Sequence, residues 1–186
     1  MLKPQDILVA LKLVALGTEK WTYASLAKSL GLSVSETHAA VKRGLESRLL
    51  AKLDHLGRKA ERPLPNLAHL ERLIVHGLPY WMPVPRGPRK ICMGMPTADG
   101  VSPLDDEFFR PTDYLPPVWP VRSGKVKGWA LAPIHPKCVP ASQRDAGLYE
   151  LLTLVDGLRA GKARVRQAAE RILLERFSKF SRQLRS

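Results

Sequence analysis

Residues 22–50 read TYASLAKSLGLSVSETHAAVKRGLESRLL, and the fold of the first third of the chain depends on this stretch. Thr22 is suited to begin a helix, because its hydroxyl can accept a hydrogen bond from a first-turn N–H. Gly31 is suited to end that helix, because glycine adopts the left-handed conformation at little cost. Ser33 and Glu36 have the spacing of a capping box, in which each side chain binds the backbone N–H of the other residue. The stretch therefore predicts a helix, a tight turn and a second helix.

We expect the second helix to run from Val34 to about Ser47 and to have two faces of different composition. The inner face has small and apolar side chains, namely Val34, Thr37, Ala40, Val41, Gly44 and Leu45. The outer face is polar and basic and consists of Ser35, Glu36, His38, Ala39, Lys42 and Arg43. Two helices joined by a short turn that contains glycine are the arrangement that places a helix in the major groove of DNA. The alternative is a helical hairpin that binds a protein or only dimerises.

The stretch resembles the helix-turn-helix of winged-helix transcriptional regulators of the MarR type. The resemblance is carried by Tyr23-Ala24-Ser25-Leu26-Ala27, Gly31-Leu32-Ser33, Val41-Lys42-Arg43 and Leu49-Leu50. Two residues depart from the pattern: Gly44 stands where such helices usually have leucine, and Arg48 stands where a glycine usually precedes the first strand of the wing. We expect both departures to leave the core slightly under-filled. The resemblance implies a homodimeric, sequence-specific repressor that binds double-stranded DNA and is not an enzyme.

On this interpretation, the residues that contact DNA lie on the second helix and around it. Lys42 and Arg43 would reach bases or phosphates, and Ser35 and His38 would contact base edges or the backbone. Ser33 would meet a phosphate at the helix N-terminus, where unpaired N–H groups attract anions. The remaining candidates are Thr22, Glu36, Ala39 and, in the wing, Arg58 and Lys59.

Two further elements complete the predicted winged helix-turn-helix domain, which spans residues 1–62. A first helix is expected over residues 4–16 and should pack across the other two. Residues 49–53 form the first strand of the wing, and the wing tip falls at residues 54–59. No second strand is convincing in residues 60–63, so we expect a wing that is short or absent. The basic tip either reaches a phosphate or a minor groove, or is an exposed loop.

The chain is strongly basic, with a formal net charge of +13 and a pI near 10.1, and the positive charge is spread along its whole length. Such a chain concentrates near polyanions in a salt-dependent way. The same charge also suits a chain that only needs solubility or that attracts an acidic protein partner. The sequence has no apolar run long enough to cross a membrane, and its two cysteines do not describe a disulfide framework. We therefore expect a cytoplasmic protein with no membrane partner.

The composition changes at Pro63, since fifteen of the sixteen prolines lie between residues 63 and 140. We therefore predict a second, mixed domain over residues 63–186 that binds a partner or dimerises and begins with irregular structure and a small β-sheet. Its expected elements are a helix at residues 65–77 and strands at residues 78–84, 89–95 and 125–134. The loop at residues 96–120 is long enough to be a lid or a partner-binding segment.

The last part of the chain, residues 143–186, predicts a helical hairpin with helices at residues 145–159 and 162–180. The predicted fold class is therefore α+β. The outer face of the last helix carries five cations, Arg164, Arg166, Arg171, Arg176 and Lys179. A basic face of this kind either contacts the DNA backbone or is simply solvated.

The layout of the whole chain, a winged helix followed by a small mixed domain, is similar to that of AbiEi-type antitoxins from phage-defence toxin–antitoxin pairs. This resemblance implies an alternative function, in which residues 63–186 hold a toxin and the helix-turn-helix autoregulates the operon. The resemblance is one of layout, with no diagnostic motif in residues 63–186, and we infer no functional residue from it.

Few residues are candidates for chemistry, and we predict neither an enzyme nor a metal or other cofactor. His135 and Cys138 have the spacing of one zinc-ligand pair, whereas structural zinc sites usually need two such pairs. The acidic run at residues 105–107 could hold Mg²⁺, but it is more typical of a solvated loop. The aromatic residues Tyr80, Trp81, Trp119 and Trp129 could stack on single-stranded bases or form the core of the second domain.

Overall fold

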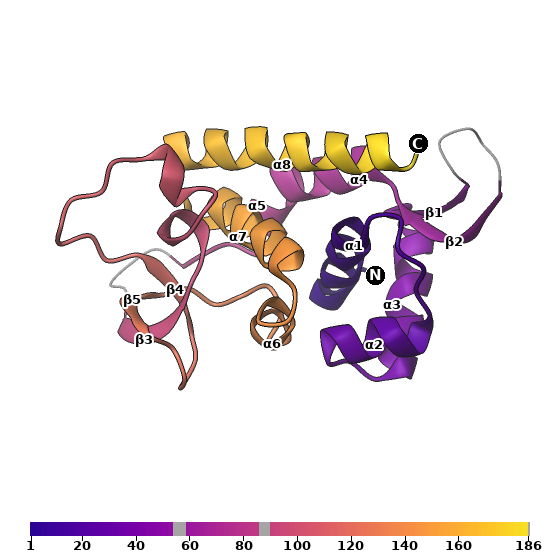
Figure 1. The fold of residues 1–186 in the computed structure, drawn as a ribbon, viewed down its shortest axis with the longest axis horizontal. Coiled ribbons are helices and arrows are strands. Elements are labelled where there is room, and N and C mark those ends of the chain that lie inside the picture. Colours follow the sequence, from indigo (N-terminus) through magenta and orange to yellow (C-terminus); the bar gives the residue numbers. More distant parts are fainter. Residues whose placement is uncertain (54–58, 86–89, 186) are drawn as a thin grey trace.

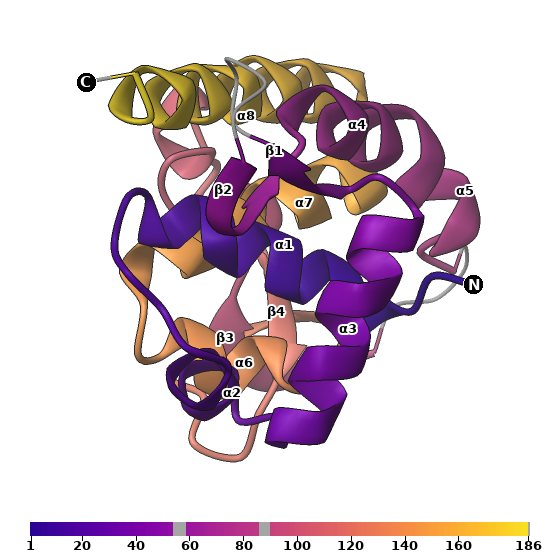
Figure 2. The same ribbon diagram turned by 90° about the vertical axis from the view of Figure 1, so that its right-hand side faces the viewer.

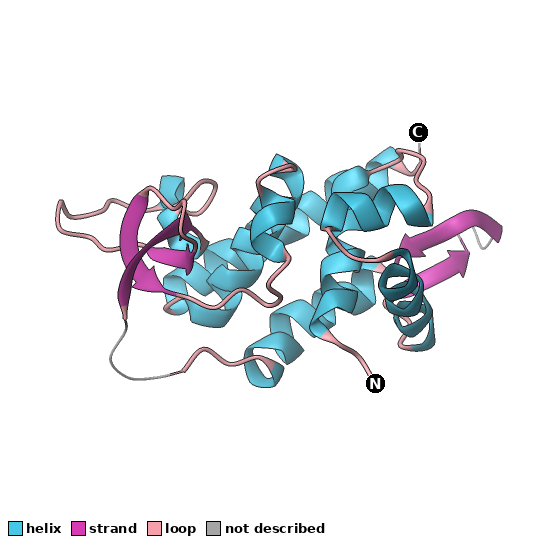
Figure 3. Ribbon diagram, turned by 90° about the horizontal axis from the view of Figure 1, so that it is seen from below, coloured by secondary structure: helices cyan, strands magenta, loops and turns pink. Residues whose placement is uncertain are grey.

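The structure is a computed structural model that describes residues 1–53, 59–85 and 90–185 and combines helices with two small groups of strands (Figure 1). The first half contains α1 (Pro4–Leu16), α2 (Tyr23–Leu30), α3 (Val34–Glu46), β1 (Leu50–Leu53) and β2 (Lys59–Pro65). The second half contains α4 (Leu67–Arg72), α5 (Leu78–Trp81), β3 (Ile91–Pro96), β4 (Pro117–Pro120), β5 (Val126–Ala130), α6 (Cys138–Ser142), α7 (Ala146–Ala160) and α8 (Ala163–Gln183). The two groups of strands lie at opposite ends of the molecule with helices between them (Figure 3). The prediction of a mixed α+β fold is confirmed.

The helices α2 and α3 begin where their capping residues predict. Thr22 Oγ1 accepts a hydrogen bond from Ser25 N at 3.1 Å, and Ser33 Oγ accepts one from Glu36 N at 3.1 Å. The inner face of α3 is correctly predicted except at its first residue, Val34, whose side chain is 49% exposed. The first buried residue of α3 is Thr37, so the first turn of the helix extends beyond the helices that support it.

Gly44 and Arg48 do not leave the core under-filled, so that expectation is wrong. The side chain of Leu50 fills the space beside Gly44, where a methyl group would lie only 2.9 Å from Leu50 Cδ1. Arg48 adopts a φ of 61°, which is the left-handed conformation that a glycine would adopt more easily. The chain therefore turns into β1 through an arginine in a strained backbone conformation.

A second strand, β2, follows β1, although residues 60–63 contain no convincing strand pattern. β2 pairs antiparallel with β1, with Leu50 opposite Pro65 and Ala51 opposite Leu64. Proline is tolerated here because each strand of a two-stranded sheet has one edge whose N–H groups need no partner strand. The predicted domain boundary after residue 62 falls inside β2. Residues 54–58, which include the predicted tip, lie outside the described residues.

The helix that begins with α4 continues further than its sequence predicts. A π-helical stretch, Leu73–Gly77, joins α4 to α5, so residues 78–84 do not form the predicted strand. Pro79 is the second residue of α5 and lies just after the π-helical stretch. Pro83 disfavours a helical conformation for Met82, and α5 ends there.

The three strands of the second half close into a small barrel. β3 runs antiparallel to both β4 and β5, and β4 runs parallel to β5. β3 and β5 confirm the strands predicted at residues 89–95 and 125–134, although both are shorter. β4 was not predicted, because Pro117 and Pro120 at its ends resemble turn residues.

Helices α1 and α7 join the two halves through one continuous hydrophobic core (Figure 1). α1 packs against α3 and β2 and also against α7, which in turn packs against α8. Both helices of the predicted C-terminal hairpin are present. Lys12 of α1 is only 7% exposed, and its Nζ lies 2.5 Å from Oδ2 of Asp145, the N-cap of α7. The two predicted domains therefore share a core and a partly buried ion pair.

A buried carboxylate connects α7 to the barrel. Asp156 is 1% exposed and accepts hydrogen bonds from Trp119 Nε1 at 2.6 Å, Thr97 Oγ1 at 2.8 Å and Arg159 Nη1 at 2.7 Å. Burial raises the pKa of Asp156, while the three donors act in the opposite direction. Trp119 is therefore a core residue, whereas Tyr80 is 86% exposed.

Candidate nucleic-acid interface

Helix α3 presents one face to solvent at the end of the molecule opposite the β3–β5 barrel (Figures 1 and 2). It packs on α1, α2 and β1. No element of the second half makes extensive contact with it among the residues that the structure describes. Ser35, His38 and Lys42 are exposed, and Ala39 is half-buried. Their helical spacing places these four residues on one stripe, which we call the α3 stripe.

Arg43 does not belong to this stripe, so its predicted place on the outer face is wrong. Its guanidinium forms a two-pronged ion pair with Asp6 of α1, with Nε–Oδ2 at 2.8 Å and Nη2–Oδ1 at 2.6 Å. The Asp6 side chain is fully buried and also accepts a hydrogen bond from Lys3 N at 2.8 Å. The hydrogen bonds from Arg43 to Asp6 raise the pKa of Arg43. Arg43 therefore fixes α3 against the N-terminus of α1.

Three other residues that we predict to contact DNA form helix caps. Thr22 caps α2, and Ser33 and Glu36 form the reciprocal capping box of α3, with Ser33 N donating to Glu36 Oε2 at 2.8 Å. The backbone N–H and hydroxyl of Ser33 lower the pKa of Glu36, and Lys137 and His135 lower it further. All three side chains are exposed, but their oxygen atoms already have partners within the protein.

His38 is held in place by an aromatic contact. Its ring stacks on that of Tyr23, with 3.8 Å between centroids and 18° between planes. Tyr23 in turn meets the edge of Trp21, which is 8% exposed and belongs to the core. The stack fixes the orientation of an exposed imidazole on the α3 stripe, which favours directional hydrogen bonds.

Three cations that sequence reasoning missed surround the turn between α2 and α3. Lys28 lies in the last turn of α2, and Lys137 and Arg144 lie on either side of α6. A methyl group at Gly31 would lie 3.4 Å from Arg144 Nη2 and 4.0 Å from Lys137 Nζ, so both side chains reach the turn. Arg144 also donates to the carbonyl oxygens of Pro140 at 2.9 Å and Lys28 at 3.3 Å, which hold its guanidinium against α2. We call Lys28, Lys137 and Arg144 the turn cations.

The other basic residues predicted to contact DNA lie in the wing tip and on α8. Arg58 and the side chain of Lys59 lie outside the described residues. On α8, Arg171 pairs with Glu107 and Glu175, and Arg176 pairs with Glu150. Two of the five cations predicted for the outer face of that helix are therefore paired with carboxylates of the protein.

The residues considered for metal binding do not form a site. Cys138 is fully buried in the core, and burial raises the pKa of its thiol to about 12. Among the described residues, no three His, Cys, Asp or Glu side chains converge in a way that could hold a metal ion. In the acidic run at residues 105–107, Arg110 pairs with Asp105, and Ser102 donates to Asp106.

No helix in the described part of the chain is both long and apolar enough to cross a bilayer. Comparison of the chain with protein-family models, curated proteins and solved structures finds no match, so a function must be argued from its own residues.

Proposed function

We propose that this protein is a sequence-specific transcriptional regulator that binds double-stranded DNA with α3 in the major groove. The observation that carries the proposal is the position of α3, which is capped at its start, supported by α1 and α2, and uncovered along the α3 stripe. The major groove admits one α-helix, and side chains on the exposed face of that helix reach base edges. With β1 and β2 following α3, the first half has the element order of a winged helix-turn-helix domain.

Different residues contact bases and phosphates in this proposal. Ser35 and His38 can exchange hydrogen bonds with base edges, and Lys42 suits the O6 and N7 atoms of guanine. The turn cations and the first N–H groups of α3 bind the DNA backbone. The α3 stripe contains one lysine, so most of the electrostatic attraction comes from the residues around it.

We also propose that the protein acts as a homodimeric repressor, which is what the resemblance to MarR-type regulators implies. A two-fold dimer reads an inverted repeat, because each copy of α3 faces one half-site. The centres of the half-sites would then lie about one helical turn apart, roughly 34 Å.

Selection of bound DNA from a random-sequence pool, carried out at about 50 mM and 200 mM salt, tests this proposal. We expect an inverted-repeat consensus that is enriched at both salt concentrations. Retention of DNA only at low salt, without a consensus, would show bulk electrostatic binding and contradict sequence-specific recognition.

The turn cations provide a second test. Replacing Lys28 or Lys137 with alanine should weaken binding to all sequences alike and reduce the salt slope of log K by about one for each phosphate that the variant no longer neutralises. Lys127→Ala is the matched control, since Lys127 is exposed on β5 at the opposite end of the molecule. An unchanged slope in both turn variants would remove these residues from the interface.

A second candidate function is favoured by two exposed aromatic residues of α5. Tyr80 is 86% exposed and Trp81 is 40% exposed, and such side chains are enriched at protein interfaces. In this alternative the second half holds a partner protein, such as the toxin of a toxin–antitoxin pair, and DNA binding serves autoregulation. Co-purification of a co-expressed neighbouring gene product that the Y80A/W81A variant loses would support this function, whereas retention by that variant would oppose it.

A further inference from the structure

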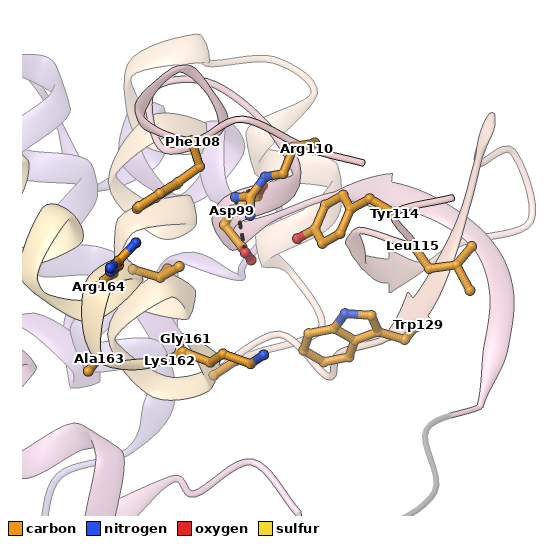
Figure 4. Close-up of a pocket in the computed structure, with 12 residues that line it drawn as sticks. Asp99, Phe108, Arg110, Tyr114, Leu115, Trp129, Gly161, Lys162, Ala163 and Arg164 are labelled. Carbon is orange, nitrogen blue, oxygen red and sulfur yellow. Dashed lines mark hydrogen bonds and ion pairs between the residues drawn. The ribbon is translucent and has the colours of Figure 1, made fainter. Parts of the chain in front are cut away.

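A cavity of about 620 Å³ lies far from α3, between the loop before β4, strand β5 and the beginning of α8 (Figure 4). Phe108, Arg110 and Tyr114 lie along one side of it, and Trp129 and Lys162 lie along the other (Figure 4). This volume falls within the range of pockets that hold drug-sized ligands, roughly 300–1,000 Å³.

The side that contains Tyr114 is held in place by neighbouring groups. The guanidinium of Arg110 lies between two rings, 4.9 Å from the centroid of Phe108 and 4.5 Å from that of Tyr114. Arg110 Nη2 also pairs with Asp99 Oδ2 at 3.1 Å. Burial and the nearby Asp99 carboxylate raise the pKa of Tyr114, so its phenol remains a proton donor at neutral pH. Arg110 Nε also pairs with Asp105 Oδ1 at 3.3 Å, so this side is pre-organised and its three charged groups sum to a formal charge of −1.

The other side is cationic. Lys162 and Arg164 line the cavity and are exposed, and within the described residues neither side chain has an ion-pair or hydrogen-bond partner. Lys162 is also the N-cap of α8, and no side chain caps this helix. The first N–H groups of α8 and the two cations therefore present positive charge to the same space, and this charge exceeds the −1 of the Asp99, Asp105 and Arg110 group.

We propose that this cavity binds a nucleoside monophosphate, with the base against Tyr114 and the accessible part of Trp129, which is 9% exposed, and the phosphate at Lys162, Arg164 and the start of α8. A flat base covers the aromatic walls, because every base has a π-face that can stack on such rings. A phosphate satisfies the two unpaired cations and the uncapped N–H groups. Inorganic phosphate alone would leave the apolar part of the cavity unfilled, and an apolar ligand would leave the cations unpaired. The proposal does not depend on DNA binding by α3.

The proposal can be tested by isothermal titration calorimetry of the full chain. The ligands are the four common ribonucleoside monophosphates, their parent nucleosides and inorganic phosphate. We expect at least one monophosphate to bind about tenfold more tightly than both its nucleoside and inorganic phosphate, a difference of about 1.4 kcal/mol. The K162A/R164A variant should lose about tenfold in affinity for that monophosphate. The control K179A/R182A changes two exposed cations on the same helix away from the cavity and should bind as the wild type does.

The proposal is overturned if no monophosphate binds more tightly than its nucleoside and inorganic phosphate, or if K162A/R164A binds as tightly as the wild type. Because all four substituted side chains are exposed, neither variant should unfold, and a circular dichroism melt of each variant verifies this.

Discussion

Arg43 is expected to stabilise the fold rather than to contact DNA, and this can be measured by replacing it with methionine. Methionine keeps an unbranched apolar stem and removes the guanidinium. The buried Asp6 carboxylate then loses two charge-assisted hydrogen bonds, at 2.6 and 2.8 Å, and keeps the one from Lys3 N. Removing one partner of a buried ion pair costs about 3–5 kcal/mol. Because the Arg43 side chain is 18% exposed and water can reach its site, we expect a loss of about 2–3 kcal/mol in the free energy of unfolding.

Urea denaturation gives this loss directly. With an m-value of about 2 kcal/mol/M, the transition midpoint should fall by about 1–1.5 M at unchanged m. In a double-mutant cycle with Asp6→Asn, the coupling free energy should be about 1.5–3 kcal/mol. Lys42→Met is the matched control on the neighbouring residue, which is exposed, and it should shift the free energy of unfolding by less than about 0.5 kcal/mol. A wild-type midpoint for Arg43→Met, together with abolished DNA binding, would refute this reasoning.

Three further predictions concern the strained turn, the close packing of α3 and the buried thiol. Arg48→Gly should raise the free energy of unfolding by about 0.5–1 kcal/mol, because it removes a left-handed arginine, and Arg48→Ala should give no such gain in the same melts. Gly44→Ala should lower the free energy of unfolding by about 1–2 kcal/mol, although alanine favours helices, because its methyl group would crowd Leu50. A gain in stability measured by calorimetry would contradict this packing. At pH 8 a thiol reagent should label the half-buried Cys92 but leave Cys138 unmodified until urea is added. The reason is that burial raises the pKa of Cys138 to about 12 and keeps its side chain as the thiol. Mass spectrometry of the labelled peptides distinguishes the two cysteines.

The starts of α2 and α3 could be predicted because each depends on residues only three positions apart. The Thr22 and Ser33 caps need only a first-turn N–H as partner, so the local sequence contains the whole interaction. The periodicity of α1, α7 and α8 is equally local. Strand β4 of the barrel could not be predicted in this way, because its partner strands lie in distant segments and its own prolines suggest a turn.

The environment of α3 could not be predicted, because it depends on how distant helices pack. Arg43 and Asp6 are 37 residues apart, and only the crossing of α1 and α3 brings them together. Arg144 and Lys28 are 116 residues apart, and they meet because α6 packs against α2. A helical wheel assigns Arg43 to the outer face of α3, but it contains no information about a buried carboxylate on a neighbouring helix.

The most direct measurement of the proposed function is a gel-shift titration of the selected DNA site with the S35A/H38A/K42A variant, which changes three residues of the α3 stripe. We expect its affinity for the selected site to fall by at least about a hundredfold, since each good base contact contributes about 1–3 kcal/mol of discrimination. Its affinity for random-sequence DNA should stay close to that of the wild type. Its urea midpoint should fall by no more than about 0.5 M, because all three side chains are exposed and only the His38–Tyr23 stack is lost. Wild-type affinity of this variant for the selected site would contradict recognition of DNA by α3.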